Sequence, residues 1–227
     1  MRAFVTSLSR AVSTRARRRL VGLTLGLGLL VGVAVGLVPA DHTFATRTGV
    51  IALLTSVTVP FLGVLMASDV RRAPQTVRPL PTLVAAVLVA VAFGLVAALV
   101  GVVTVGVLGS DAGRWQDAVA VSLGAVVTMV MAQLVGVGLG LLIGRPWLAC
   151  VATIVLPLGL WLGLGAIPAV SAAQAWVVPM TSAQHLLSGR MSGEAWAQLA
   201  VVLVLWGRCL YALGTWRLGR RGELVLV

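Results

Sequence analysis

Long apolar segments constrain the fold of this chain more than any other feature of its sequence. The hydrocarbon core of a bilayer, about 30 Å thick, requires roughly 20 apolar residues in a helix that rises about 1.5 Å per residue. Six segments meet this requirement: residues 20–38, 49–68, 82–108, 118–143, 148–167 and 196–214. They lack the alternation of a membrane β-barrel, so we predict an all-α integral membrane protein with six transmembrane helices.

The composition leaves little chain for anything else. Hydrophobic residues make up 59% of the sequence and charged residues 10%, far from the average of soluble domains. We therefore expect one transmembrane domain over residues 1–227, with no soluble catalytic domain inside it.

The basic residues, all of them arginines, predict the orientation of the spans. Short arginine-rich segments tend to stay in the cytoplasm. With both termini cytoplasmic, the inner segments hold Arg2, Arg10, Arg15, Arg17, Arg18, Arg19, Arg71, Arg72, Arg78, Arg145, Arg217, Arg220 and Arg221. The outer segments hold Arg47, Arg114 and Arg190, while Arg208 lies within span six and is expected to reach the inner headgroups. We interpret the net charge of +11 as a topology signal and an attraction to anionic membrane lipids, not as nucleic-acid binding.

Three segments outside the spans have predicted roles of their own. In residues 1–19, apolar and basic side chains fall on opposite helical faces, which predicts an amphipathic helix on the inner membrane surface; a disordered basic leader is the alternative. Residues 69–81 form the longest inner loop between spans. Residues 168–195 are apolar but interrupted by Pro168 and Pro179, so we expect short re-entrant helices on the outer side instead of a seventh crossing.

Several polar or small residues inside the spans are candidates for function or packing. Thr55, Ser56 and Thr58 precede Pro60 in span two, and either line a path or bond to carbonyls of their own helix. Gln133 is the one amide in span four, and either forms an interhelical hydrogen bond or contacts a substrate. Glycines repeat at every fourth position in spans one and four, which predicts close helix contacts: Gly28, Gly32, Gly36, Gly136, Gly140 and Gly144.

The absence of lysine excludes several kinds of catalytic site. The chain has no Gly-Lys-Ser/Thr phosphate loop, no Schiff-base lysine and no Ser-x-x-Lys dyad. Zinc-helix and nucleophile-elbow motifs are also missing, and the six acidic residues lie at or beyond the ends of the predicted spans. We expect no enzyme activity, no cofactor and no metal site in this chain.

Two stretches resemble the ABC-2 permease family, the membrane subunits of type 2 ABC exporters. One comprises Trp176-Val177-Val178-Pro179-Met180, Leu186-Leu187-Ser188-Gly189, Trp196, Trp206 and the closing Arg217-Leu218-Gly219-Arg220-Arg221-Gly222-Glu223. The other, Asp69-Val70-Arg71-Arg72 followed by Thr76-Val77-Arg78-Pro79-Leu80-Pro81, is similar to a shortened coupling loop of that family. The likeness extends over nearly the whole chain, because family members also combine an N-terminal amphipathic helix, six spans and re-entrant helices before the last span.

The resemblance implies a permease subunit of an ATP-driven exporter in a bacterial cytoplasmic membrane. Two copies of a separate ABC ATPase subunit would bind ATP and Mg²⁺, and a second permease subunit, identical or homologous, would pair with this one. The residues implied in coupling to the ATPase are Asp69, Arg71, Arg72, Thr76 and Arg78, and those of a possible substrate path are Thr55, Ser56, Thr58 and Gln133. A lipid, a hydrophobic drug, a peptide or a polyketide would each suit the mostly apolar spans.

A second hypothesis fits the same sequence. A non-transporting assembly or regulatory subunit of a larger membrane complex would share every feature above except substrate flux. A transport assay in proteoliposomes that contain the ATPase partner separates the two hypotheses.

Overall fold

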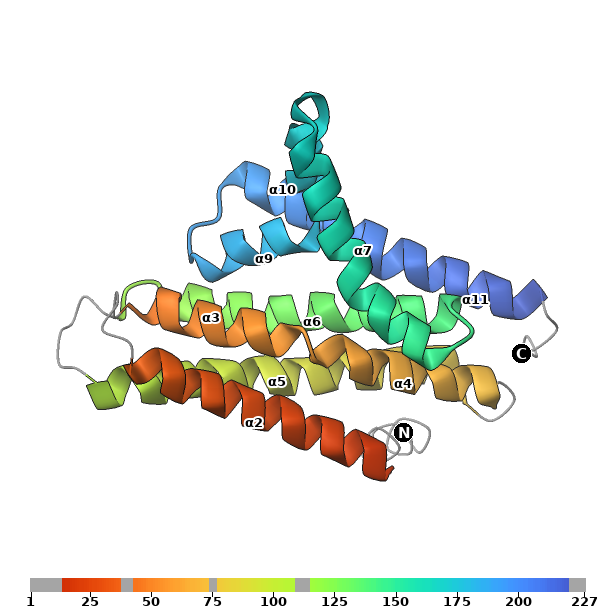
Figure 1. The fold of residues 1–227 in the computed structure, drawn as a ribbon, viewed down its shortest axis with the longest axis horizontal. Helices are drawn as coiled ribbons and strands as arrows, with labels where there is room; N and C mark the ends of the chain where they lie inside the picture. Colours follow the sequence, from red (N-terminus) through yellow and green to blue (C-terminus); the bar gives the residue numbers. More distant parts are fainter. Residues whose placement is uncertain (1–13, 38–42, 74–76, 109–114, 221–227) are drawn as a thin grey trace.

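The computed structural model describes residues 14–37, 43–73, 77–108 and 115–220, and every regular element among them is a helix (Figure 1). Six helical segments are long and apolar enough to cross a membrane, which confirms the predicted multi-pass, all-α architecture. They are α2 (Arg15–Leu37), α3 with α4 (Phe44–Ser56 and Val59–Arg72), α5 (Pro79–Leu108), α6 (Ala118–Leu142), α7 (Pro146–Ala166) and α10 with η3 and α11 (Gly193–Val202, Leu203–Cys209 and Leu210–Arg220). Between α7 and α10 lie η2 (Pro168–Ala173), α8 (Gln174–Val177) and α9 (Pro179–Leu187).

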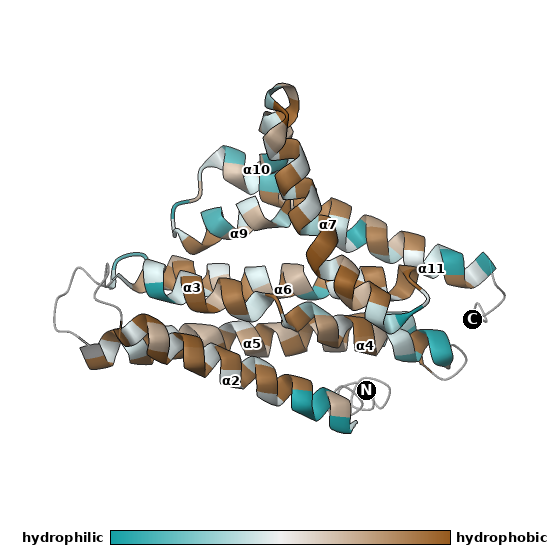
Figure 2. Cartoon of the chain, in the orientation of Figure 1, coloured by the Kyte–Doolittle hydropathy of each residue, from teal (hydrophilic) through white to brown (hydrophobic). Residues whose placement is uncertain are grey.

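Most of the long helices run side by side. α2, α5, α6 and the α3–α4 pair follow the long axis of the molecule, and α11 lies beside the second half of α6 (Figure 1). The start of α2 and the end of α11 lie at the same end. Hydrophobic residues cover the middle of these helices and hydrophilic residues gather at both ends (Figure 2). This distribution is that of a bundle whose long axis crosses a bilayer.

α6 is the central helix, in contact with α3, α4, α5, α7, α9 and α11. Two glycines of its predicted ridge face α4. A Cβ atom at Gly136 would overlap the backbone of Pro60, and one at Gly140 would lie 2.7 Å from the Cβ of Ala67. Only glycine allows the two backbones to approach this closely. The predicted ridge is therefore a helix contact surface, and the fold identifies α4 as its partner.

α7 crosses the bundle steeply and projects from it, with η2 and α8 at its far end (Figure 1). The first half of α6 is covered by α9, where a Cβ at Gly124 would lie 2.5 Å from the carbonyl oxygen of Leu186. As a result, only 11% of the span formed by α7 is buried, against 56% of the span formed by α3 and α4.

The helix of the first span begins before the predicted span. Residues 15–19, which we assigned to an amphipathic helix over residues 1–19, form the first turns of α2, and Arg17 lies on the buried face of that helix. The remainder of the predicted amphipathic helix, residues 1–13, lies outside the described residues.

The non-helical connection between spans two and three is also shorter than the segment 69–81 that we predict as a loop. α4 continues to Arg72, and α5 begins at Pro79. Proline is tolerated in a first helical turn because the amide hydrogens there have no partner within the helix. The connection between the two spans is therefore limited to residues 73–78.

The helix of the last span widens in its middle segment, η3, which is π-helical. There the indole Nε1 of Trp206 donates a hydrogen bond to the carbonyl of Val177 at 2.7 Å, which ties the end of α8 to span six. Arg208 lies in the same segment with its side chain exposed, so its guanidinium is not a buried charge.

Candidate functional site

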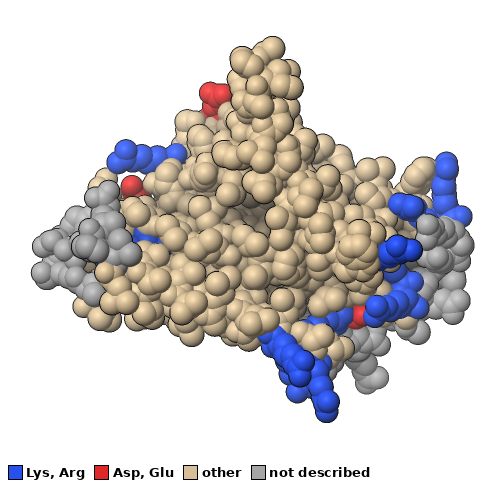
Figure 3. Space-filling model, in the orientation of Figure 1, with Lys and Arg blue, Asp and Glu red and all other residues tan. Residues whose placement is uncertain are grey.

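Arginines gather at the end of the bundle where α2 begins and α4 and α11 end (Figure 3). The described members of this basic end are Arg15, Arg17, Arg18, Arg19, Arg71, Arg72, Arg78, Arg145, Arg217 and Arg220. The described part of the opposite end holds Arg47 and Arg190. This distribution agrees with the predicted asymmetry between inner and outer segments.

A partly buried ion pair joins α2 to α4 at the basic end. The guanidinium of Arg17 donates from Nη2 to Oδ2 of Asp69 at 2.7 Å and to the carbonyl of Leu65 at 2.7 Å. The Arg17 side chain is 5% exposed and that of Asp69 31% exposed. Because the guanidinium side of the pair is buried, this contact holds the start of α2 against the last turns of α4.

Two other arginines bind the end of α6. Arg71 donates from Nη1 to the carbonyl of Ile143, and Arg217 donates from Nη1 to the carbonyl of Leu142 at 3.1 Å. The last carbonyls of a helix have no partner within it and carry its negative dipole end, so cations are favourable there. Arg71, predicted to face an ATPase, is thus directed at α6 of its own chain.

Of the predicted coupling residues not yet described, two are exposed and one lies outside the described residues. Arg72 and Arg78 are both exposed, one at the end of α4 and the other just before α5. Thr76 lies outside the described residues. The exposed arginines that remain for contact with a partner beside this loop are therefore Arg72 and Arg78.

Span two is interrupted at Val57 and Thr58, between α3 and α4. Pro60 follows at once, and it has no N–H to bond to the carbonyl of Ser56. The three predicted hydroxyls donate within their own segment: Thr55 to the carbonyl of Ile51 at 2.6 Å, Ser56 to that of Leu53 at 2.7 Å, and Thr58 to that of Thr55 at 3.0 Å. The interpretation of bonding to their own helix therefore applies to all three.

Gln133 fastens α6 to the first turn after this break. Its side chain is fully buried. In the amide orientation that satisfies both of its groups, Nε2 donates to the carbonyl of Val59 at 2.6 Å and Oε1 accepts from the N–H of Gly63 at 3.3 Å. Gln133 thus makes the interhelical hydrogen bonds that were one of its two predicted roles.

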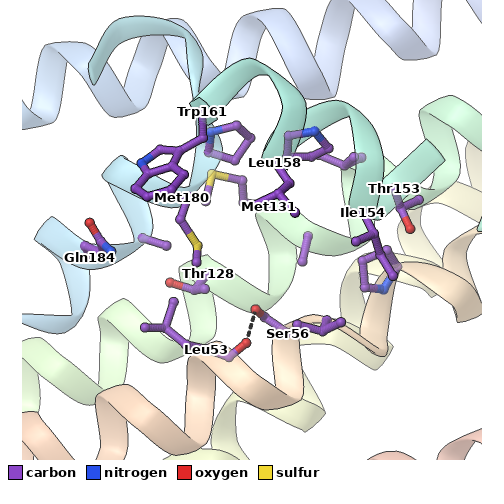
Figure 4. Close-up of a pocket in the computed structure, with 17 residues that line it drawn as sticks. Leu53, Ser56, Thr128, Met131, Thr153, Ile154, Leu158, Trp161, Met180 and Gln184 are labelled. Carbon is purple, nitrogen blue, oxygen red and sulfur yellow. Dashed lines mark hydrogen bonds between the residues drawn. The ribbon is translucent and has the colours of Figure 1, made fainter. Parts of the chain in front are cut away.

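A cavity of about 410 Å³ lies beside the break in span two. Residues of α3, α4, α6, α7 and α9 line it, and most of them are apolar (Figure 4). Met131, Met180 and Trp161 contribute large polarisable side chains. The volume falls within the range of about 300–1,000 Å³ that is typical of small-molecule sites. This cavity is the best candidate for a ligand site in the described part of the chain.

The cavity contains one of the predicted path residues. Ser56 lines it, whereas Thr55, Thr58 and Gln133 are not among its lining residues. Thr55 faces α2 instead, where its Oγ1 would lie 3.4 Å from a Cβ at Gly28.

Sequence reasoning missed other lining residues, including Thr128 of α6 and Thr153 of α7. One available signal could have found the site: Pro60 and Pro157 each lie within an apolar span, and both line the cavity. Proline-interrupted spans of transporters often border a binding site.

The described residues contain no group of three or more His, Cys, Asp or Glu side chains that could hold a metal ion. Comparisons with protein-family models, with curated proteins and with solved structures find no match to this chain.

Proposed function

We propose that this chain is the transmembrane permease subunit of an ATP-driven exporter, which moves hydrophobic or amphipathic molecules across a bacterial cytoplasmic membrane. In this proposal a separate ABC ATPase subunit, present in two copies, binds ATP and Mg²⁺. Both termini face the cytoplasm, because the basic end is attracted to anionic lipids of the inner leaflet.

The observation that carries the proposal is a direct mechanical path from the basic end to the cavity. Arg72 and Arg78 are exposed beside the short connection between α4 and α5, where an acidic partner surface can dock. α4 has 14 residues, so it forms a rod of about 21 Å between this connection and the break in span two. The pair between Arg17 and Asp69 attaches α2 to the same rod. A push on the connection would thus move two spans and one wall of the cavity together.

A second permease subunit has a suitable surface in α7. This helix projects from its own bundle and exposes large apolar side chains, among them Val155, at 57% exposed, and Leu162, at 56% exposed. Helices in lipid gain van der Waals packing when another helix covers them. We propose that the second subunit, identical or homologous, packs against α7.

Charge reversal at the exposed arginines tests ATPase docking. Arg72→Glu and Arg78→Glu should each reduce co-purification of the ATPase subunit roughly tenfold, because an interface charge that meets its own sign repels the partner. Arg190→Glu, which reverses one exposed charge at the opposite end, is the matched control and should have no effect. Normal co-purification of both inner variants would remove the proposed docking surface.

Arg71→Glu must be kept apart from this test, because Arg71 bonds the end of α6. Its reversal should lower folding stability whether or not an ATPase binds. The transport step itself is tested by ATP-dependent flux in proteoliposomes that contain both subunits. A complex that assembles normally but gives no flux with any hydrophobic substrate would instead support a regulatory or assembly role.

A further inference from the structure

Three prolines line the cavity between α3, α4, α6, α7 and α9. Pro60 follows the break in span two, Pro157 lies inside the continuous helix α7, and Pro179 is the first residue of α9. Proline cannot donate to the carbonyl four residues earlier, so Pro60 and Pro157 leave the carbonyls of Ser56 and Thr153 without their helical donors. Both of these residues also line the cavity. The backbone of Ser56 and of Thr153 therefore carries an acceptor that lacks its helical donor.

The hydroxyl groups of Ser56 and Thr153 add further acceptors, and that of Thr128 can both accept and donate. The Ser56 hydroxyl donates to the carbonyl of Leu53 at 2.7 Å, and the Thr153 hydroxyl donates to that of Cys150 at 2.7 Å. A hydroxyl that has given its only proton can still accept through its lone pairs. Thr128 is 2% exposed, and its Oγ1 has no hydrogen-bond partner within the described chain. An unpaired buried hydroxyl costs free energy, which a bound ligand would recover by bonding to it.

Charge is the property that the cavity lacks. None of the described residues that line it is acidic or basic. The remaining polar side chains are the amide of Gln184 and the indole of Trp161, and both residues are exposed. Moving an anion or a cation into an apolar site without a counter-charge is strongly unfavourable, whereas a hydroxyl or amide needs only hydrogen-bond partners.

We propose that this cavity binds an uncharged hydrophobic molecule whose polar group donates a hydrogen bond, such as a hydroxyl or an amide. The apolar body lies against Met131, Met180 and Trp161, and the polar group meets Ser56, Thr128 or Thr153. Identification of this ligand with the transported substrate rests on the proposed function, but binding to the cavity does not require the ATPase.

Photolabelling of the full chain in lipid nanodiscs tests the inference. The probe is a long-chain alcohol that carries a diazirine, and labelled peptides are located by mass spectrometry. Three competitors with the same chain carry a hydroxyl, a carboxylate or a trimethylammonium group. We expect peptides of α6, α7 and α9 to be labelled, and the alcohol to compete at a concentration at least about tenfold lower than either ion.

An internal control lies elsewhere on the bundle. A groove of about 420 Å³ between α2 and α5 is lined by aliphatic residues, glycines and Thr104, whose hydroxyl already donates to the carbonyl of Val100 at 2.6 Å. Labelling there should follow lipid partitioning and show no added preference for the alcohol. Each competitor's effect in the cavity is therefore normalised to its effect in this groove.

Two variants locate the binding. Ala183→Phe places a large side chain at a buried lining position and should abolish labelling in the cavity while labelling of the groove between α2 and α5 persists, which reports a folded bundle. Thr128→Val keeps the shape but removes the hydroxyl, and should reduce the preference for the alcohol.

Equal competition by the carboxylate or the ammonium, or labelling spread evenly over all lipid-facing helices, would overturn the inference. Selective binding without ATP-dependent flux would refute the transport function and leave the ligand class intact. ATP-dependent flux without selective labelling would refute the ligand class and leave the transport function intact.

Discussion

Replacing Gln133 by leucine tests whether this side chain fastens α6 to the break in span two or belongs to a substrate path. The substitution keeps the approximate volume and removes two hydrogen bonds, to Val59 and Gly63. Interhelical hydrogen bonds in membranes average about 0.6 kcal/mol and reach about 1.7 kcal/mol, so two of them correspond to roughly 1–3 kcal/mol.

The backbone geometry narrows this range. Val59 and Gly63 are four residues apart at the start of α4, so the carbonyl and the N–H that Gln133 bridges are the natural partners of one helical hydrogen bond. When the amide is lost, these two groups can pair with each other and neither stays unsatisfied. We therefore expect a loss at the lower end, about 1–1.5 kcal/mol.

Unfolding in mixed micelles at rising mole fraction of dodecyl sulfate, followed by tryptophan fluorescence, measures the change. Gln198→Leu is the matched control, because Gln198 is also buried but bonds to Glu194 of its own helix at 3.0 Å. Its loss should stay below about 0.5 kcal/mol, as for other pairs within one helix.

The outcome separates the two roles of Gln133. The structural role requires that Gln133→Leu lose more stability than Gln198→Leu while substrate flux per folded complex is unchanged. Equal stability of the two variants together with lost flux for Gln133→Leu would refute the structural reasoning and restore the residue to the substrate path.

Other contacts make predictions of the same kind. Asp69→Asn and Arg17→Gln should show a coupling of at least about 1 kcal/mol in a double-mutant cycle, because the pair is largely buried; additive losses would mean that the ion pair contributes nothing. Gly136→Ala should destabilise by at least about 2 kcal/mol, since its Cβ would overlap the backbone of α4, and a neutral result in the same unfolding assay would contradict this approach of the two helices. Trp206→Phe removes the bond to the carbonyl of Val177 and should speed hydrogen exchange in α8 roughly fivefold, as expected for about 1 kcal/mol; unchanged exchange would show that this bond does not hold α8.

The membrane-spanning character of this chain is determined by the sequence alone. Segment length and hydrophobicity respond to the thickness of the bilayer and not to neighbouring helices, so six runs of apolar residues predict six helices. The arginine distribution is likewise a property of the linear chain, and the structure gathers the inner arginines at one end of the bundle. The spacing of Gly136 and Gly140 also predicted a close helix contact correctly.

The tertiary structure decided which groups face each other. Arg71, a predicted coupling residue, bonds the end of α6, because a helix end that lacks internal partners attracts a nearby cation. α9 packs against α6 and contacts α7 as well. The cavity forms where these helices meet the bundle, and its Thr128, Thr153 and Ser56 come from three helices that only packing brings together. The hydrophobicity of a segment determines whether that segment is stable in lipid. Contacts between helices depend instead on the shapes of side chains from distant segments, which no single segment encodes.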